Sequence, residues 1–431
     1  MPGLPFNDFL ADDDIAEIIN HTPHKRESIF TPLVTLKAFI FQTLSADGSC
    51  KDAVASVLAD RLNEGKSANS TNTGPYSKAR QRLPLQQIKT AAANAGSTLH
   101  QQSDKKLHWK GFKVVLVDGT TVTMPDTPEN QAAYPQQNTQ KPGLGFPIAR
   151  LVVMISLSIG SIINYSIGPY QGKQTGESSL FSQLIDSLSL GDILIADRYY
   201  CTFAIISLLQ SMQIPVLFQM HARRKVNFKR GQKLGAKDHI VDWHKPKLKP
   251  IWMSTEAYAE LPNTLRVREF SINGIIYTTT LMDSSLYTKR ETAIFYKERW
   301  HVELDLRAIK THMGMEVLRC KTPEMVEKEI AVNFLAYTII RGNIAQAAVL
   351  HHKTPRKLSF KSALQIMTQS TKQLTQWVGE LLNNGLNDLF KAIASNAVGM
   401  QKRKNQPRAI KRRPKPFPLL TVPRKEACAA L

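Results

Sequence analysis

Two aspartates follow short apolar segments that predict β-strands. Asp118 comes directly after the run 113–117, and Asp197 comes directly after the run 193–196. In an α/β sheet, a carboxylate at the carboxyl end of a strand faces the crevice where ligands bind, so neighbouring strands would bring the two side chains together. Each aspartate also has a simpler interpretation, since Asp-Gly is a common turn and Asp197 could pair with Arg198 at the surface.

A third carboxylate lies on a segment, 296–310, whose pattern predicts a helix. At about 100° per residue, a stripe about 60° wide along this helix holds four polar side chains: Tyr296, Arg299, Glu303 and Lys310. One carboxylate between two bases and a phenol suits contact with a phosphodiester. The same stripe also fits a solvated face on which Arg299 and Glu303, four residues apart, form an ion pair.

Carboxylates from two strands and one helix form a donor set for a divalent metal ion. Mg²⁺ prefers oxygen ligands and retains water, so Asp118, Asp197 and Glu303 together with a substrate phosphate would complete its coordination, and Mn²⁺ is expected to substitute. Two such ions activate an attacking water or 3′-hydroxyl and stabilise the leaving oxygen. No zinc motif, phosphate-binding glycine loop or serine-nucleophile elbow competes with this interpretation.

The 431-residue chain is strongly basic, with 56 lysines and arginines against 35 aspartates and glutamates and a formal net charge of +21. Such an excess predicts a polyanionic partner, nucleic acid before an anionic membrane. The bases concentrate in two segments: 221–250 carries ten bases and two acids, and 401–431 carries ten bases and one acid. No apolar run is long enough for a membrane helix, and four widely spaced cysteines predict reduced thiols in a cytoplasm.

The predicted elements that must position the carboxylates change character along the chain. Helical patterns fill 30–100, strands and helices alternate over 111–212 as in an α/β sheet, and strands return over 215–282. Two long helical patterns follow, over about 289–312 and 323–349, and then shorter ones to about 398. We therefore divide the chain into four parts: a helical N-terminal DNA-binding region 1–105, a catalytic core 106–322 with a β-rich insertion at about 215–285, C-terminal helices 323–400 and a basic tail 401–431.

The N-terminal region contains a short basic segment, 76–83, that follows a polar loop. Its bases Lys78, Arg80 and Arg82 could line a DNA backbone. They could equally form an ordinary solvated helix face.

Three motifs, taken in order, resemble those of the DDE transposases of bacterial insertion sequences, in the group named for insertion sequence 4. They are Asp-Gly-Thr at 118–120, Gly-Asp-Ile-Leu-Ile-Ala-Asp-Arg at 191–198 and the spacing Tyr-x2-Arg-x3-Glu-x6-Lys at 296–310. The resemblance covers about residues 30 to 350. It implies a ribonuclease-H-like catalytic core with a β-rich insertion, flanked by a helical N-terminal domain and C-terminal helices.

The resemblance also implies roles for individual residues. It assigns metal binding and catalysis to Asp118, Asp197 and Glu303, and it places Tyr296, Arg299 and Lys310 at the DNA phosphates near the cut. In some relatives an aromatic residue of the insertion stacks on a flipped base. Trp243 is the candidate for that role and Trp252 the competitor, although a tryptophan on a strand is more often part of the core.

The function implied is cut-and-paste transposition in the bacterial cytoplasm, in association with the nucleoid. The protein would bind the inverted-repeat ends of an insertion sequence, cleave them with Mg²⁺ or Mn²⁺ and join the 3′-hydroxyls to target DNA, as a homodimer on paired ends. Two alternatives stay open: a metal-dependent DNA nuclease of the same fold without strand transfer, and a non-catalytic DNA-binding derivative.

Overall fold

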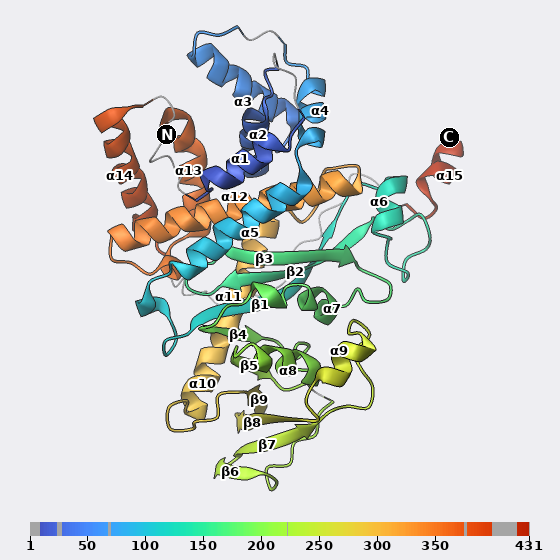
Figure 1. The fold of residues 1–431 in the computed structure, drawn as a ribbon. Coiled ribbons are helices and arrows are strands. Elements are labelled where there is room, and N and C mark those ends of the chain that lie inside the picture. Colours follow the sequence, from blue (N-terminus) through green and yellow to red (C-terminus); the bar gives the residue numbers. More distant parts are fainter. Residues whose placement is uncertain are drawn as a thin grey trace, which may run out of the picture.

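A mixed β-sheet runs through the molecule, and the computed structural model describes residues 9–23, 28–67, 70–221, 223–374, 377–398 and 420–430. Within these residues the sheet has nine strands, in the order β3-β2-β1-β4-β5-β9-β8-β7-β6 (Figure 1). The strands are β1 (Lys113–Thr123), β2 (Ile148–Ser156), β3 (Ile162–Pro169), β4 (Asp192–Ala196), β5 (Val216–Gln219), β6 (Gln232–Gly235), β7 (Asp238–His244), β8 (Thr264–Ile272) and β9 (Ile275–Thr279).

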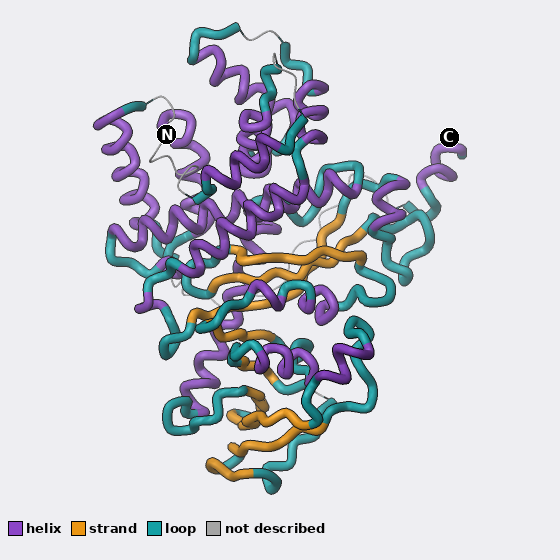
Figure 2. Tube along the Cα trace, viewed as in Figure 1, coloured by secondary structure: helices purple, strands orange, loops and turns teal. Residues whose placement is uncertain are grey.

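Helices precede, interrupt and follow these strands along the chain, and Figure 2 distinguishes helices from strands by colour. Five come first: α1 (Asp12–Asn20), α2 (Pro32–Leu44), α3 (Cys50–Asn63), α4 (Gly74–Arg82) and α5 (Leu85–Gln101). Between the strands lie α6 (Pro128–Ala133), α7 (Glu177–Ser182), α8 (Phe203–Ser211) and α9 (Thr255–Glu260). After them come α10 (Lys289–Tyr296), α11 (Trp300–Arg307), α12 (Pro323–Leu350), α13 (Phe360–Leu374), α14 (Gly379–Ser395) and α15 (Arg424–Ala429). None of the described helices is long and apolar enough to cross a membrane.

The strand directions divide the sheet into two halves. β2 lies antiparallel to β1 and β3 antiparallel to β2, whereas β4 is parallel to β1 and β5 is parallel to β4. From β5 outward, β9, β8, β7 and β6 are all antiparallel to their neighbours. The strands expected over 215–282 therefore extend the same sheet, and the structure adds β6 and α9, which the sequence did not predict.

The two faces of the sheet pack into separate hydrophobic cores. Along β1, Val114 and Leu116 join the core that contains α5, α11 and α12, whereas Val115 and Val117 join the core that contains α7 and α8. This alternation follows from the two-residue period of a strand. It also fixes which face each later residue of β1 addresses.

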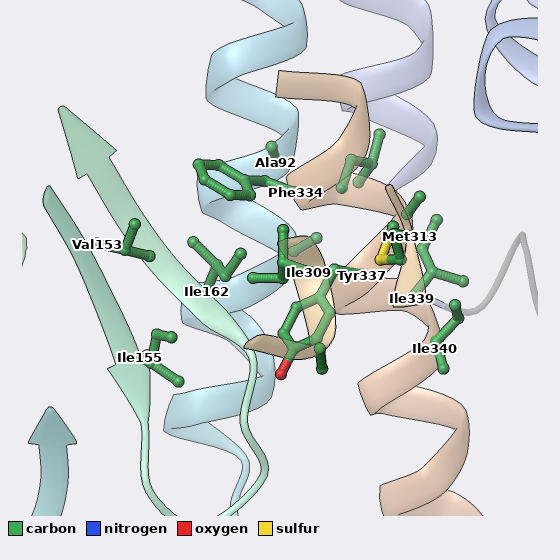
Figure 3. Packing of buried hydrophobic residues seen from close by; sticks show 14 of the residues in the cluster. Ala92, Val153, Ile155, Ile162, Ile309, Met313, Phe334, Tyr337, Ile339 and Ile340 are labelled. Carbon is green, nitrogen blue, oxygen red and sulfur yellow. The ribbon is translucent and has the colours of Figure 1, made fainter. Parts of the chain in front are cut away.

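The long helical pattern expected over 289–312 is confirmed, since the whole segment is helical, but its winding changes twice. α10 gives way to a 3₁₀ turn (Lys297–Arg299), and α11 ends in a π-helical turn (Ala308–His312). The π-helical turn keeps Ile309 buried in the core shared with β3 and α12, where Figure 3 shows it near Ile162 and Phe334. Such turns occur often at functional sites.

Candidate active site

Asp118 and Asp197 lie on adjacent parallel strands. Leu116 of β1 is paired with Ile195 of β4. Two residues further along each strand, Asp118 and Asp197 therefore stand at the same level, on strands that run about 4.8 Å apart. Leu116 and Ile195 both belong to the core shared with α11, so the two-residue period directs both aspartates towards that helix.

The position of Asp118 differs from the prediction in one respect. β1 does not end at Val117 but continues to Thr123, because Asp118 and the residues after it remain paired with β2. What ends just before Asp118 is the pairing of β1 with β4. The carboxylate thus stands at the edge where the parallel strands separate, on a strand that is held from its other side.

Glu303 reaches this edge from α11, which lies against β1. The opposite side of α11 is anchored by Asp305, a fully buried residue that accepts a hydrogen bond from Tyr337 Oη (2.8 Å) and pairs with Arg356 (2.7 Å). Because Asp305 holds α11 against α12 and the following segment, Glu303 is left facing the strands.

Arg299 joins two of the three carboxylates. Its Nη1 lies 3.5 Å from Asp118 Oδ2, and its Nη2 donates a hydrogen bond to Glu303 Oε1. The ion pair expected along the helix is therefore present, and it extends to the sheet. The structure brings Asp118, Asp197, Arg299 and Glu303 together from two strands, a 3₁₀ turn and a helix.

The aspartates lie in a partly buried environment that disfavours their charge. Burial raises the pKa of Asp118 to about 6, although the Gly119 amide and the Arg299 guanidinium act to lower it. Burial also raises the pKa of Asp197, against a hydrogen bond donated by the Tyr199 amide (2.7 Å). A cation bound beside these groups would therefore be strongly stabilised.

A fourth carboxylate, Glu177, belongs to the same edge and was missed in the sequence. It lies in the first turn of α7 and packs against Gly119, where a Cβ atom would be only 2.5 Å from Glu177 Oε1. Burial and the charge of Asp197 raise the pKa of Glu177. A glutamate at the start of a short helical pattern carries no spacing signal that could have identified it.

Tyr296 is placed as a support for β4. Its side chain is 9% exposed, and its hydroxyl donates a hydrogen bond to the carbonyl oxygen of Ala196 (3.1 Å), the residue before Asp197. Its ring also meets Tyr277 edge to face. The hydroxyl is thus engaged by β4 instead of being exposed for the DNA phosphate that the family resemblance implies for Tyr296.

Lys310 stays available for a phosphate. It lies on the π-helical turn, half-buried, and within the described residues it has no hydrogen bond or ion pair. Because a π-helical turn winds more loosely than an α-helix, Lys310 is rotated away from the stripe computed for a regular helix.

The three bases of α4 differ in their surroundings. Lys78 is exposed and Arg82 is half-buried, but Arg80 is 9% exposed. Arg80 donates hydrogen bonds to Gln42 Oε1 (3.2 Å) and to a cysteine sulfur, and its guanidinium lies over the Tyr76 ring. The expectation that Arg80 contacts DNA is corrected by this placement, because the side chain is enclosed within the N-terminal helices.

Trp243 is also enclosed. It is 3% exposed on β7, its Nε1 donates a hydrogen bond to Glu269 (2.6 Å), and the Arg224 guanidinium lies 3.5 Å from the ring centre. A base could stack on Trp243 only after Arg224 had moved away. Trp252, the competing candidate, is half-buried.

The carboxylates at this edge of the sheet are suitable ligands for a divalent cation, although their oxygens are not grouped around a single position. Among the described residues no three Asp, Glu, His or Cys side chains are grouped closely enough to hold a metal ion, and Arg299 bridges Asp118 and Glu303 instead. The donors are nevertheless all carboxylate oxygens, as Mg²⁺ prefers. Beside them the fully buried Tyr200 hydroxyl has no hydrogen-bond partner within the described residues, as expected of a group that binds a ligand or its water.

A family model and a curated relative identify the same family. The family model described as "Transposase DDE domain" matches residues 109–339. The transposase InsG of insertion sequence element IS4 from Escherichia coli is 26% identical over 363 residues, which cover 82% of this chain and 79% of that protein. A solved piggyBac transposase in a synaptic complex with hairpin DNA is 9% identical, with a TM-score of 0.47 over 90% of this chain and 85% of the other.

Proposed function

The chain belongs to the DDE transposase family, and from this premise we propose that it carries out cut-and-paste DNA transposition. It binds the inverted-repeat ends of an insertion sequence, cleaves them with a divalent metal ion and joins the freed 3′-hydroxyls to target DNA. The observation that carries this proposal is the convergence of Asp118, Asp197 and Glu303 on one edge of the sheet. Their convergence requires two strands and a helix that are distant in the sequence.

The same proposal extends to the fold. The half-sheet β3-β2-β1-β4-β5, with helices on both faces, is a ribonuclease-H-like core in which β1 and β4 carry the aspartates. The strands from β6 to β9 belong to the insertion, which was expected at about 215–285 and which on this assignment begins after β5. The helices of 1–105 read the element ends, the helices of 323–400 complete the core, and the tail is a basic arm, of which 401–419 and 431 lie outside the described residues.

The metal site consists of Asp118, Asp197 and Glu303, with Mg²⁺ as the natural ion and Mn²⁺ as its substitute. When bound, such an ion supplies an activated water or 3′-hydroxyl and stabilises the leaving oxygen. Arg299 then leaves the two carboxylates that it bridges and turns to a DNA phosphate, and Lys310 contacts a second one. Tyr296 holds the end of β4, so that the backbone before Asp197 keeps its position.

The partner is DNA, and the charge of the chain supports this choice. A net charge of +21, with ten bases over 221–250, provides the phosphate neutralisation on which non-specific DNA binding rests. Holding two ends together requires at least two copies of the chain, so the active species is a homodimer on paired ends in the bacterial cytoplasm.

A joining assay tests the proposal. Labelled duplexes carrying the element's own ends are incubated with target DNA and Mg²⁺ or Mn²⁺, with the wild type beside Glu303→Gln. The matched control is Glu298→Gln, which changes an exposed glutamate five residues earlier whose partner among the described residues is His301. We expect metal-dependent joining by the wild type and the control, and no chemistry but unchanged DNA binding by Glu303→Gln.

The other outcomes identify the alternatives. Cleavage without joining would make the protein a nuclease of the same fold. Tight binding of the ends by the wild type with no metal-dependent chemistry would identify the protein as a non-catalytic DNA-binding derivative.

A further inference from the structure

We propose that Glu177 is a fourth carboxylate of the metal site and reaches it from the face of the sheet opposite to Glu303. The inference rests on the proposed metal-dependent function and adds a residue to it. Three observations carry it: the contact of Glu177 with Gly119, the absence of a hydrogen bond or close ion pair to its carboxylate within the described residues, and the hydroxyl of Tyr200, which has no partner there either.

The contact with Gly119 fixes where the carboxylate of Glu177 lies. Val115 and Val117 belong to the core under α7, so Gly119 addresses that same face. The Glu177 carboxylate fills the space that a side chain at 119 would take, with Oε1 at 2.5 Å from the position of a Cβ atom. Glu177 therefore lies against the residue that follows Asp118, on the α7 face of β1, while Asp118 faces α11, and the charges of the two carboxylates act on each other.

Glu177 has no hydrogen-bonding partner of its own. Within the described residues it accepts no hydrogen bond and forms no ion pair within 4 Å. The charge of Arg150 acts on Glu177, but the Arg150 guanidinium donates its hydrogen bond to the Thr175 carbonyl (2.8 Å). The charges of Asp118 and Asp197 also interact with that of Glu177, and such repulsion between partly buried carboxylates is unfavourable unless a cation offsets it.

Tyr200 supplies an independent observation. Its ring is fully buried and its hydroxyl has no partner in the described part of the chain. The charges of Glu177, Asp118 and Asp197 all act on that hydroxyl and raise its pKa further, after the larger effect of burial. An orphan donor among these carboxylates is explained if a water bound to the metal ion lies between them.

Calorimetric titration of the DNA-free full chain with Mn²⁺ tests the inference. The variants are Glu177→Gln, which keeps the shape of the side chain, and the control Glu129→Gln, an exposed glutamate in the first turn of α6, another six-residue helix. We expect Glu177→Gln to weaken Mn²⁺ binding about 10- to 100-fold, as is usual for residues that support a metal ion. The control should bind Mn²⁺ like the wild type.

A melting experiment in EDTA separates this role from a merely structural one. Removing one of several crowded charges should raise the metal-free Tm of Glu177→Gln, whereas loss of a structural contact would lower it. A lowered Tm together with wild-type Mn²⁺ affinity would overturn the inference.

Asp118→Asn and Glu303→Gln, titrated in parallel, distinguish the two proposals. If they lose Mn²⁺ binding while Glu177→Gln retains it, the three-carboxylate site stands and only the role of Glu177 fails. If the wild type binds no Mn²⁺, or all variants bind it equally, both the metal site and the role of Glu177 are overturned.

Discussion

The guanidinium of Arg299 lies 3.5 Å from the carboxylate of Asp118, which ties the segment after α10 to the middle of β1. The same guanidinium donates a hydrogen bond to the carboxylate of Glu303. One protein cation thus neutralises two carboxylates that would otherwise repel each other in a partly buried setting. Arg299 and a metal ion consequently compete for the same acids.

Substitution of Arg299 by Gln should reveal that competition. Without metal, Asp118 and Glu303 lose their counter-charge, so we expect the free energy of unfolding at neutral pH to fall by about 1–2 kcal/mol. Mn²⁺ should bind the variant more tightly than the wild type and restore its Tm. Melting curves in EDTA and in Mn²⁺ measure both effects, with Arg307→Gln, which changes an exposed arginine at the end of α11, as the control. An unchanged Tm in EDTA would contradict the bridging role.

Asp118→Asn should stabilise the metal-free protein in a pH-dependent way. The pKa of Asp118 is raised to about 6 from an ordinary value of 3.8, mainly by burial. The cost of the charged form is therefore absent below about pH 4, grows as the pH passes about 6 and is complete above about pH 7. At pH 7–8 we expect the free energy of unfolding of Asp118→Asn to exceed that of the wild type by up to about 3 kcal/mol, and its Tm to be higher. The two melting curves should converge near pH 4. A difference that stays constant with pH would contradict this origin.

The strands that carry Asp118 and Asp197 could be predicted because each depends on a local pattern, whereas the pairing of β1 with β4, which brings the two aspartates together, is known from the structure. A short apolar run before an aspartate indicates a strand end, and the two-residue period then decides the face. The choice of Glu303 as the third carboxylate likewise needed only the spacing of polar residues along a helix. The continuation of β1 beyond Val117 was missed, since the polar residues that follow Asp118 are paired with β2.

Burial of single polar side chains could not be predicted, because it depends on partners far away in the sequence. Arg80 is enclosed by Gln42 and Tyr76, and Trp243 is held by Glu269. A sequence pattern records that a base lies on a helix or a tryptophan on a strand. It does not record which other helix or strand covers it.

Two bases of α4 should have different roles: Arg80 should contribute to stability, and Lys78 to DNA binding. Arg80→Ala removes two hydrogen bonds and a contact with the Tyr76 ring, so we expect a loss of about 3 kcal/mol in the free energy of unfolding. Lys78→Ala should leave stability unchanged and reduce the slope of log K against log salt for DNA by about one. Chemical denaturation and salt-dependent binding measurements check the pair. Equal effects of the two variants on DNA binding at unchanged stability would contradict the placement of Arg80.

Tyr296→Phe tests whether Tyr296 supports β4 or contacts DNA. The variant removes only the hydroxyl that bonds the Ala196 carbonyl, so we expect the free energy of unfolding to fall by about 1 kcal/mol. The affinity for end duplexes should stay the same, because the buried hydroxyl does not reach a phosphate. Tyr199→Phe, which alters an exposed tyrosine close to Asp197, should change neither quantity.

The opposite pattern would assign Tyr296 to DNA. If Tyr296→Phe keeps the Tm of the wild type but binds the ends more weakly, its hydroxyl must leave Ala196 when DNA arrives. Since the bond to Ala196 lies one residue before Asp197, such a movement would also shift that carboxylate, and Mn²⁺ affinity measured with DNA present would fall together with DNA affinity. A fall in stability alone keeps Tyr296 as the support of β4.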